Sequence, residues 1–325
     1  MQKPLVSVIV PIYRQHQHAN SCLVSIIQSN YKNLEIIAVT DDIRYVQSLG
    51  EDSRIKYVKC TTPYIGDARN AGMKLAKGKY LSFVDADDII CDAFISSLVK
   101  ELESDDRIDI AESAIEVFET TYYPVLYEHV MSHRCAETTE EKFALLEQYP
   151  DDCVCQTNKL YRAETFRNLC YPSGLLCEGD AMVYDEWRTA RKIIYLNGPL
   201  YGRRLERSVL TEPEISEQYF IDSIKARIHV LDSVYTDDAL SVINKADSSD
   251  WMEFMISRMM DELIELYPHI PHTEKIINAL KDADVKYNRY RRFTQKHLLY
   301  DVFFAFPHIT SAIAARIGDK EATNE

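Results

Sequence analysis

The segment Tyr80–Val84 constrains the fold of this chain more than any other, because it is an apolar run that leads directly into a cluster of carboxylates. A run with no polar alternation is typical of a strand that is covered on both faces in a parallel sheet. The next residues are Asp85, Ala86, Asp87 and Asp88. Ligands of parallel sheets bind beyond the carboxyl ends of the strands, so these carboxylates lie where a binding site is expected.

Two interpretations of this acidic cluster remain open. Like charges this close repel one another, and a hard divalent cation such as Mg²⁺ or Mn²⁺ would neutralise them while bridging to the phosphates of a substrate. Alternatively, the segment is an acidic turn in which Asp88 or Asp92 caps a helix over residues 93–104. Taken alone, the cluster favours neither interpretation.

The first hundred residues alternate strand-like and helix-like segments. The helical stripe that precedes Tyr80 is made of small side chains, such as Ala68, Ala71 and Gly72, and could approach a sheet closely. This alternation predicts an α/β domain whose mostly parallel sheet is flanked by helices. The predicted strands are Leu5–Val10, which Pro11 closes, Leu34–Val39, Ile55–Val58, Tyr80–Val84, Ile108–Phe118 and Ile193–Leu196.

Composition and missing motifs exclude several functions. The formal net charge of −14 argues against nucleic-acid binding, because contact with a phosphate backbone needs clustered Lys and Arg. No Gly-x-Gly-x-x-Gly turn or P-loop follows the first strand, and the eight cysteines lack paired CxxC spacing. No signal-peptide pattern is present, and no apolar run reaches the roughly 18 residues of a membrane-spanning helix. We therefore expect a cytoplasmic protein with reduced cysteines.

Several motifs lie at the ends of the predicted elements. Pro11-Ile12-Tyr13 follows the first strand, Thr40-Asp41-Asp42 the second and Asp85-Ala86-Asp87 the fourth, while Ala68-Arg69-Asn70-Ala71-Gly72 opens a helix. In order, spacing and strand context, this set resembles the family 2 glycosyltransferases, which are nucleotide-sugar enzymes with the GT-A fold.

The resemblance also divides the chain. Motif agreement is close over residues 6–102 and looser beyond them, and the last third of the chain shows helical periodicity only. We predict a GT-A domain over residues 1–210, with a nucleotide-sugar-binding half (1–105) and an acceptor-side half (106–210). A helical C-terminal region over residues 211–325 follows.

The resemblance implies a site for a UDP-sugar donor. Pro11 and Tyr13 match the segment that lines the nucleoside pocket, and Asp41 matches the acidic residue that reads the uracil base. The loop departs from the family pattern, because Thr40-Asp41-Asp42-Ile43 stands where Asp-Asp-Gly-Ser is usual. A differently shaped loop is therefore expected at this position.

Further residues are implied at the diphosphate. Arg69 matches an arginine that lies near the diphosphate or the metal-binding aspartates in relatives, and Arg204 could close over the diphosphate. Asp85, Ala86 and Asp87 match the Asp-x-Asp motif, in which the first aspartate lies near the ribose and the second binds the metal. The resemblance thus implies Mn²⁺ or Mg²⁺ as cofactor, with Asp87 and Asp85 as ligands. Surface arginines without a role are the alternative for both arginines.

Sugar transfer with inversion also needs a general base that deprotonates the acceptor hydroxyl. Relatives carry it in a Glu-Asp pair, and the matching stretch of this chain places Gly179 at the base position. We predict Asp180 as the base, with Glu178 as the alternate or as an acceptor contact, because a glycine could let the turn shift by one residue. As alternatives, both carboxylates only cap the next helix, or the chain is a non-catalytic binding or scaffold subunit.

The predicted reaction is a metal-dependent, inverting transfer of a hexose or hexose derivative from a UDP-sugar to a hydroxyl of a growing glycan. The acceptor could be a surface polysaccharide, a lipid-linked oligosaccharide or a glycoprotein glycan. The sequence does not identify the sugar.

Residues 286–306 combine a basic stretch with an aromatic-rich apolar one. In an otherwise acidic chain this predicts peripheral contact with the inner face of the cell membrane, which would suit a lipid-linked acceptor. The alternative is a terminal helix that packs on its own domain or on a second subunit of a homo-oligomer.

Overall fold

Two units make up the chain, Met1–Glu206 and Arg207–Glu325. The boundary that we predicted between residues 210 and 211 lies outside the described residues. The computed structural model describes residues 3–13, 18–43, 52–119, 132–205, 213–236, 256–257, 260–261, 263–264, 267–270, 272–290 and 297–307.

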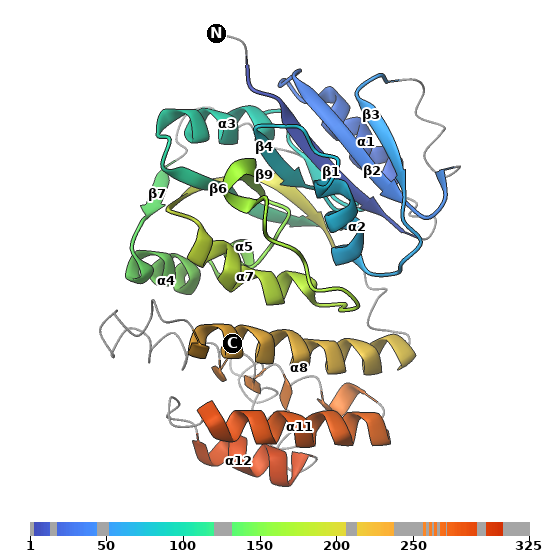
Figure 1. Cartoon of the computed structure of the whole chain (residues 1–325), viewed down its shortest axis with the longest axis vertical. Helices are drawn as coiled ribbons and strands as arrows, with labels where there is room; N and C mark the ends of the chain where they lie inside the picture. The colour runs from blue at the N-terminus through green and yellow to red at the C-terminus, as the bar shows by residue number, and fades with distance from the viewer. Residues whose placement is uncertain are drawn as a thin grey trace. The chain divides into compact units, whose positions relative to one another are not determined.

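Strands and helices alternate in the first unit, as the sequence predicts (Figure 1). The strands are β1 (Val6–Ile12), β2 (Leu34–Thr40), β3 (Ile55–Lys59), β4 (Tyr80–Phe83), β5 (Ile89–Ile90), β6 (Ile108–Phe118), β7 (His133–Ala136), β8 (Lys159–Arg162) and β9 (Lys192–Arg204). The helices are α1 (Ala19–Gln28), α2 (Ile65–Met73), α3 (Phe94–Ser104), α4 (Thr139–Gln148), α5 (Pro150–Cys153), α6 (Ala163–Phe166) and α7 (Glu178–Thr189).

The strands form one sheet in the order β3-β2-β1-β4-β8-β6-β9-β5, and β7 pairs with β9. Strands β3, β2, β1 and β4 are parallel neighbours, and so are β6 and β9, whereas β8 runs antiparallel between β4 and β6. The predicted α/β architecture, with a large sheet flanked by helices, is confirmed. As a result, the C-terminal ends of β1, β2, β4, β6 and β9 lie along one edge, where β8 begins.

Helices cover the central strands on both faces, because every residue of β1 and β2 is buried. Apolar side chains of α1 and α3 join one face of β1 in the main core, where Val8 and Ile36 are fully buried. Helix α2 packs on β1 and β2 from the other face, and Gly72 lies there against Ile9. The close approach that the small-residue stripe predicts is thus confirmed for this helix.

The first strand does not end at Pro11, as we predicted, but continues to Ile12. Its pairing with β4 ends at Ile9, opposite Phe83, so Pro11 has a strand neighbour on one side only. Sheets tolerate proline at such positions, because no ladder hydrogen bond is lost there.

The last strand of the sheet is also longer than predicted, since β9 runs past Leu196 to Arg204. Its pairing with β6 shifts register between Ser113 and Ala114, and this irregularity takes up the Asn197-Gly198 pair that the sequence pattern indicates as a stop. The extension carries Arg204 to the edge of the sheet where β4 ends.

The described elements of the second unit are helical, as predicted. They are α8 (Pro213–Thr236), the short 3₁₀ helix η3 (Tyr267–His269), α11 (Glu274–Tyr290) and α12 (His297–Ala305). Within the described ranges of the chain, no helix is both long and apolar enough to cross a membrane.

Aromatic side chains of α12 pack inside this second unit. Tyr300 and Phe303 are fully buried, and the Phe303 ring lies 5.8 Å from the Tyr267 ring. In α11, the side chains of Lys286 and Arg289 both donate to Asp232, over 3.2 and 3.3 Å. These contacts support a terminal helix that packs on its own unit, while residues 291–296 of the predicted basic stretch lie outside the described residues.

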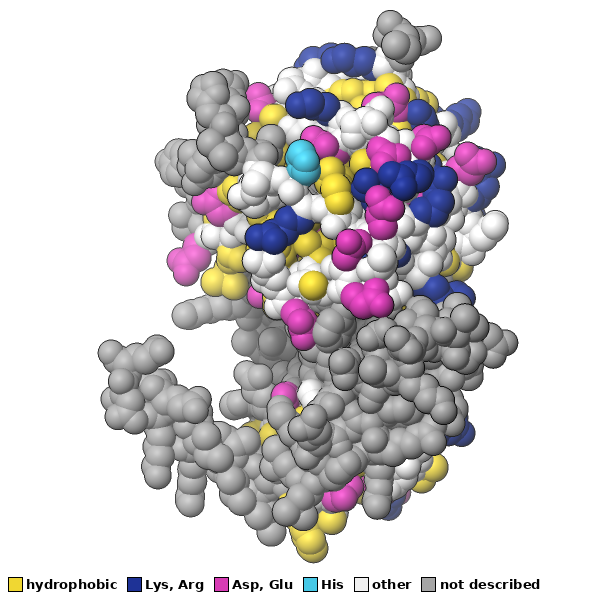
Figure 2. Space-filling view, turned by 90° about the vertical axis from the view of Figure 1, so that its left-hand side faces the viewer, with side chains coloured by type: hydrophobic (Ala, Val, Ile, Leu, Met, Phe, Trp, Pro, Cys, Tyr) yellow, Lys and Arg dark blue, Asp and Glu magenta, His cyan; other side chains and the backbone are white. Residues whose placement is uncertain are grey.

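Charges of both signs are mixed on the surface. On the described part of the face shown in Figure 2, Lys and Arg side chains lie beside Asp and Glu side chains. The excess of acidic residues is therefore not gathered into a single acidic patch on this face, which suits a solvated surface.

The packing of α2 on β1 predicts an unusual response to a Gly72→Ala substitution. Alanine is favoured over glycine in a helix by about 1 kcal/mol, yet a Cβ at Gly72 would lie 2.4 Å from Cγ2 of Ile9. We expect the overpacking to dominate and to lower the free energy of unfolding by about 1–3 kcal/mol, measured by urea denaturation. Lys74→Ala, an exposed change just beyond the same helix, is the control and should have little effect. A more stable Gly72→Ala variant would show that α2 does not contact β1 this closely.

Candidate functional site

Polar residues gather along the edge where the parallel strands end. Tyr13 follows β1, Asp41 follows β2, and Asp85 follows β4 after one further residue. The Val84 amide donates to the Ile9 carbonyl over 3.1 Å, which keeps β1 and β4 together up to this edge. The predicted site residues of the three strands are therefore brought to one side of the sheet, where ligands of such sheets bind.

Half-buried and buried side chains alternate along the acidic turn after β4. Asp85 and Asp87 are half-buried, whereas Ala86 and Asp88 are buried. The Asp88 amide donates to the Asp85 carbonyl over 3.0 Å and closes the turn. Two carboxylates of the Asp-x-Asp motif are thus accessible together, as a metal or diphosphate site requires.

The third aspartate supports the turn from within. Tyr201 donates to one carboxylate oxygen of Asp88 over 2.6 Å, and the Arg204 amide donates to the other over 2.9 Å. Burial, together with the charges of Asp85 and Asp87, raises the pKa of Asp88 to about 8. Asp88 thereby fastens the turn to β9.

The structure contradicts the alternative that this cluster is a helix cap. Helix α3 has Ala93 as its N-cap, and among the described residues no side chain forms a capping hydrogen bond there. The Asp88 carboxylate accepts hydrogen bonds from Tyr201 and Arg204 of β9. The Asp92 carboxylate accepts a hydrogen bond from the Cys91 thiol over 3.4 Å. The acidic residues are therefore placed by tertiary contacts, not by the needs of α3.

Arg69 joins the acidic turn to α7. One terminal nitrogen of its guanidinium donates to Asp85 over 2.9 Å, and the other donates to Glu178 over 2.7 Å. Only 4% of the Arg69 side chain and 6% of the Glu178 side chain are exposed. A buried arginine between two carboxylates holds both in fixed positions through charge-assisted hydrogen bonds.

Aromatic rings surround this arginine. Its guanidinium carbon lies 5.7 Å from the centre of the Phe83 ring and 5.4 Å from that of Tyr171. Burial alone would lower the pKa of Arg69, but the charges of Asp85 and Glu178 outweigh it, and the pKa is raised. Arg69 thus remains charged, and its terminal nitrogens are engaged by protein carboxylates.

Asp41 offers an acceptor that the described protein does not use. Its Oδ1 atom is buried and has no hydrogen-bond partner in the described part of the chain. The Thr40 hydroxyl shapes the loop, because it bonds both the amide and the carbonyl of Asp42 at 3.2 Å. An unpaired buried oxygen is costly, so this atom is well suited to accept a hydrogen bond from a ligand.

The residues predicted to line the nucleoside pocket lie at the ends of β1 and β2. Pro11 is buried beside Val39, and Tyr13 is half-buried just past the end of β1. Both therefore lie on the same edge as Asp41. The described loop ends at Ile43, because residues 44–50 lie outside the described ranges.

The residues predicted to supply the base lie in the first turn of α7. Glu178 is its first residue, and Gly179 follows inside the helix, without the positive φ that a shifted turn would require. The irregular turn that we suggested at Gly179 is therefore not found. Asp180 lies in the same helical turn, but its side chain is outside the described part of the structure.

Gln156 occupies the space beside Gly179. A Cβ at Gly179 would lie 3.2 Å from Cγ of Gln156, and the Gln156 amide is 3.4 Å from the Gly179 carbonyl oxygen. The Tyr171 hydroxyl donates to the same amide group over 3.2 Å. The N-cap of α7 is Cys177, with no side-chain cap among the described residues, so the contact of Glu178 with Arg69 replaces the predicted capping role.

Arg204 reaches the acidic turn from the end of β9. Its Nε donates to the Asp87 carbonyl over 3.0 Å, and its guanidinium lies 4.5 Å from the centre of the Phe118 ring. The structure thus brings Arg204 next to the Asp-x-Asp motif, as the predicted diphosphate contact requires.

The acidic turn offers carboxylate oxygens to a cation. Across the described ranges, no three His, Cys, Asp or Glu side chains are arranged to hold a metal ion. Asp85 and Asp87 form a pair of half-buried carboxylates, and Mg²⁺ sites often use one or two carboxylates together with substrate phosphates and water. These two residues therefore fit an ion that binds together with a diphosphate.

Some supporting residues were not predicted from the sequence. Tyr171, Gln156 and Phe83 surround or align the Arg69 and Gly179 region, and Tyr201 fastens Asp88. They lie in segments without a periodic pattern or inside a strand, so their types alone gave no functional signal.

Comparisons with known proteins agree with this geometry. Residues 7–170 match the sequence model of Glycosyl transferase family 2. Glycosyltransferase GlyA of Streptococcus pneumoniae is 30% identical over 250 residues, which are 70% of this chain and 34% of GlyA. Glycosyltransferase GlyG of the same species is 26% identical over 229 residues, which are 65% of this chain and 75% of GlyG. The match therefore spans about a third of the length of GlyA.

Solved structures share the fold. TarS 1-349 of S. aureus, in complex with UDP-GlcNAc, has a TM-score of 0.68 and 17% identity, and the alignment covers 96% of this chain and 92% of that one. A longer TarS structure has a TM-score of 0.70 and 17% identity, over 94% of this chain and 53% of that one. At this identity the likeness shows the fold alone, which is the predicted GT-A fold.

Removal of the Arg69 side chain tests the buried bridge. Arg69→Met would leave the Glu178 carboxylate buried without its partner, so we expect the free energy of unfolding to fall by about 3–5 kcal/mol. Arg107→Met is the control, because 56% of that side chain is exposed and the loss should stay below about 1 kcal/mol. Chemical denaturation measures both. The double variant Arg69→Met/Glu178→Met should recover part of the loss, and strictly additive losses would contradict the bridge.

Proposed function

Because this chain belongs to Glycosyl transferase family 2, we propose that it transfers a hexose or hexose derivative from a UDP-sugar to a hydroxyl of a growing glycan. The observation that carries the proposal is the common edge at which Asp41, Asp85 and Asp87 lie. The UDP-GlcNAc complex of TarS, which shares the fold, supports a UDP-sugar as donor. The acceptor would be a surface polysaccharide, a lipid-linked oligosaccharide or a glycoprotein glycan.

The nucleoside would bind at the ends of β1 and β2. Asp41 has a buried oxygen without a partner among the described residues. The imide N–H of uracil could donate a hydrogen bond to this oxygen. Pro11 and Tyr13 line the neighbouring strand end, and the Tyr13 ring can stack on the base. These residues would fix the donor at the base.

The diphosphate would bind at the acidic turn. Asp85 and Asp87 would hold Mn²⁺ or Mg²⁺, which when bound supplies Lewis-acid stabilisation of the negative charge on the departing UDP. Arg204, held at the Asp87 carbonyl, adds a positive charge beside the phosphates. Ala86 is buried between the two aspartates and leaves the turn compact.

Inversion requires one proton transfer and one displacement. The acceptor oxygen attacks the anomeric carbon, its proton passes to a carboxylate base, and the bond from the anomeric carbon to the UDP oxygen breaks. Glu178 is buried and accepts from Arg69, so its carboxylate is already used. This contact favours Asp180 as the base and Glu178 as a residue that positions Arg69 and Asp85.

A second candidate function is donor binding without transfer. Gly179 stands at the position where relatives carry the base, and Gln156 fills the adjoining space. A non-catalytic binding or scaffold subunit would keep the nucleotide site and lack turnover. Tight binding of UDP, without UDP release when UDP-sugars, Mn²⁺ and acceptor glycans are supplied, would favour this candidate.

Contact with the membrane and assembly into a homo-oligomer are predictions from the sequence. Peripheral contact of residues 286–306 with the inner face of the cell membrane would suit a lipid-linked acceptor. The burial of Tyr300 and Phe303 supports packing within the unit instead.

Loss of the proposed metal ligand gives the first test of the reaction. We expect Asp87→Asn to lower the Mn²⁺-dependent release of UDP by about a hundredfold or more, because charge on the leaving diphosphate would be poorly stabilised. UDP release is measured over a panel of UDP-sugars, with and without EDTA. Asp106→Asn, which changes an exposed aspartate, should leave the rate unchanged. A normal rate in Asp87→Asn that EDTA does not affect would refute the metal assignment.

Two variants separate the roles on α7. Asp180→Asn should reduce turnover by about 10²–10⁴-fold while UDP affinity and thermal stability stay near those of the parent. Glu178→Gln should lower thermal stability, because it weakens the buried ion pair with Arg69. Initial rates, calorimetric UDP affinity and thermal denaturation are compared for both. Full activity in Asp180→Asn would move the base role to Glu178 or elsewhere.

A further inference from the structure

A pocket lies at the opposite edge of the sheet from the acidic turn. It is formed where Gly78 leads into β4 and Ala163 follows β8, and these ends are adjacent because Tyr80 pairs with Arg162. Its volume is about 520 Å³, within the range of small-molecule sites, which is roughly 300–1,000 Å³. We call it the basic pocket, after the side chains of Lys74, Lys77 and Arg167 that line it.

The charge of this pocket differs from that of the whole chain. Three of its twelve lining residues are cationic and none is acidic, although the chain has 51 Asp and Glu against 37 Lys and Arg. In the described part of the chain, the side chains of Lys74, Lys77 and Arg167 form no hydrogen bond or ion pair. By contrast, nearby Lys79 pairs with Glu103 over 2.5 Å. Unpaired cations that share a pocket repel one another, and a bound anion would relieve this repulsion.

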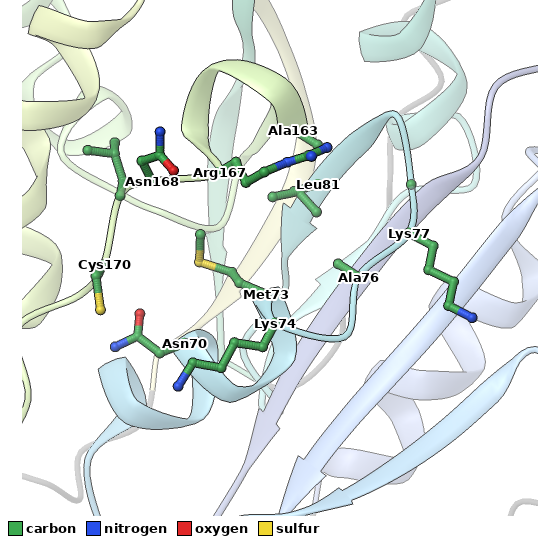
Figure 3. A pocket seen from close by; sticks show the side chains of 12 residues that line it. Asn70, Met73, Lys74, Ala76, Lys77, Leu81, Ala163, Arg167, Asn168 and Cys170 are labelled. Carbon is green, nitrogen blue, oxygen red and sulfur yellow. The ribbon is translucent and has the colours of Figure 1, made fainter.

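The arrangement of the cations indicates more than one anionic group. In Figure 3, Lys74, Lys77 and Arg167 lie at separate places around the pocket and their side chains point in different directions, with Met73 between Lys74 and Arg167. A ligand with several phosphate groups, and an uncharged body against the apolar side chains, would match the pattern.

The wall of the pocket is fixed to the protein. Asn70 exchanges two hydrogen bonds of 2.9 Å with the backbone of Tyr171, which ties the segment after α6 to α2. Asn168 is exposed beside Arg167, and its amide has no partner among the described side chains and backbone. The pocket therefore combines a braced wall with available donors.

We propose that the basic pocket binds a ligand carrying two or more phosphate groups, at a site separate from the acidic edge. The phosphates contact Lys74, Lys77 and Arg167, and the Asn168 amide donates to one of them. The source is either a free polyphosphorylated metabolite or the repeating phosphates of an anionic chain. Both present the same chemistry to the pocket.

Calorimetric titration with inorganic tripolyphosphate, at low salt and without divalent metal, tests the site. We expect the full chain to bind, and the triple variant Lys74→Gln/Lys77→Gln/Arg167→Gln to lose about tenfold or more in affinity. The matched control Lys100→Gln/Lys275→Gln/Lys281→Gln removes the same charge from exposed positions outside the pocket and should bind as the parent does. Circular dichroism establishes that all three proteins are folded.

Two results would overturn the proposal: no binding by the parent, or an equal loss of affinity in both triple variants. Long-chain polyphosphate distinguishes the sources. Tighter binding per phosphate by the long chain supports a polymeric ligand, whereas equal binding supports a small metabolite. For either conclusion about the source, only the Lys74→Gln/Lys77→Gln/Arg167→Gln variant should lose affinity for the phosphate ligand.

Discussion

The buried guanidinium of Arg69 is the interaction on which the rest of the site depends. Removal of a charge from water costs several kcal/mol, and only well-placed opposite charges offset that cost. Asp85 and Glu178 supply them at 2.9 and 2.7 Å, from the end of β4 and the start of α7. Arg69 therefore joins the end of β4 to the start of α7, next to the acidic turn.

Close packing of α2 makes this bridge possible. A Cβ at Gly66 would lie 3.0 Å from Cγ of Glu178, and one at Gly72 would lie 2.4 Å from Cγ2 of Ile9. The two glycines thus let one helix approach both α7 and β1, with Arg69 between them in sequence. A larger residue at either position would push the helix away, and the guanidinium would then lose its hold on one carboxylate.

Local patterns in the sequence predicted β1, β2, β3, β4, β6 and β9 and the residues at their ends, because burial on both faces imposes an apolar run and the topology then fixes where each run stops. The short strands β5, β7 and β8 were not predicted. Long-range contacts were not predictable in this way. Asp88 looks like a helix cap in its local sequence, but Tyr201, 113 residues away, decides its role. Tyr171 lies 101 residues from Asn70, in a segment without periodicity. The extension of β9 was missed because a register shift let the strand pass a turn-like Asn197-Gly198 pair.

The residues around Gly179 are packed in a way that suits glycine, which departs from the family pattern at this position. Gln156 lies where a side chain at this position would begin, and its amide group is bonded to the Tyr171 hydroxyl and lies near the Gly179 carbonyl. An aspartate placed there would displace Gln156 and disturb the ring that packs on Arg69. The surroundings have thus adapted to glycine, so a base for the proposed transfer would have to come from another residue of the first turn of α7. Because Arg69 already engages Glu178, the proposed transfer would rely on Asp180 as its base.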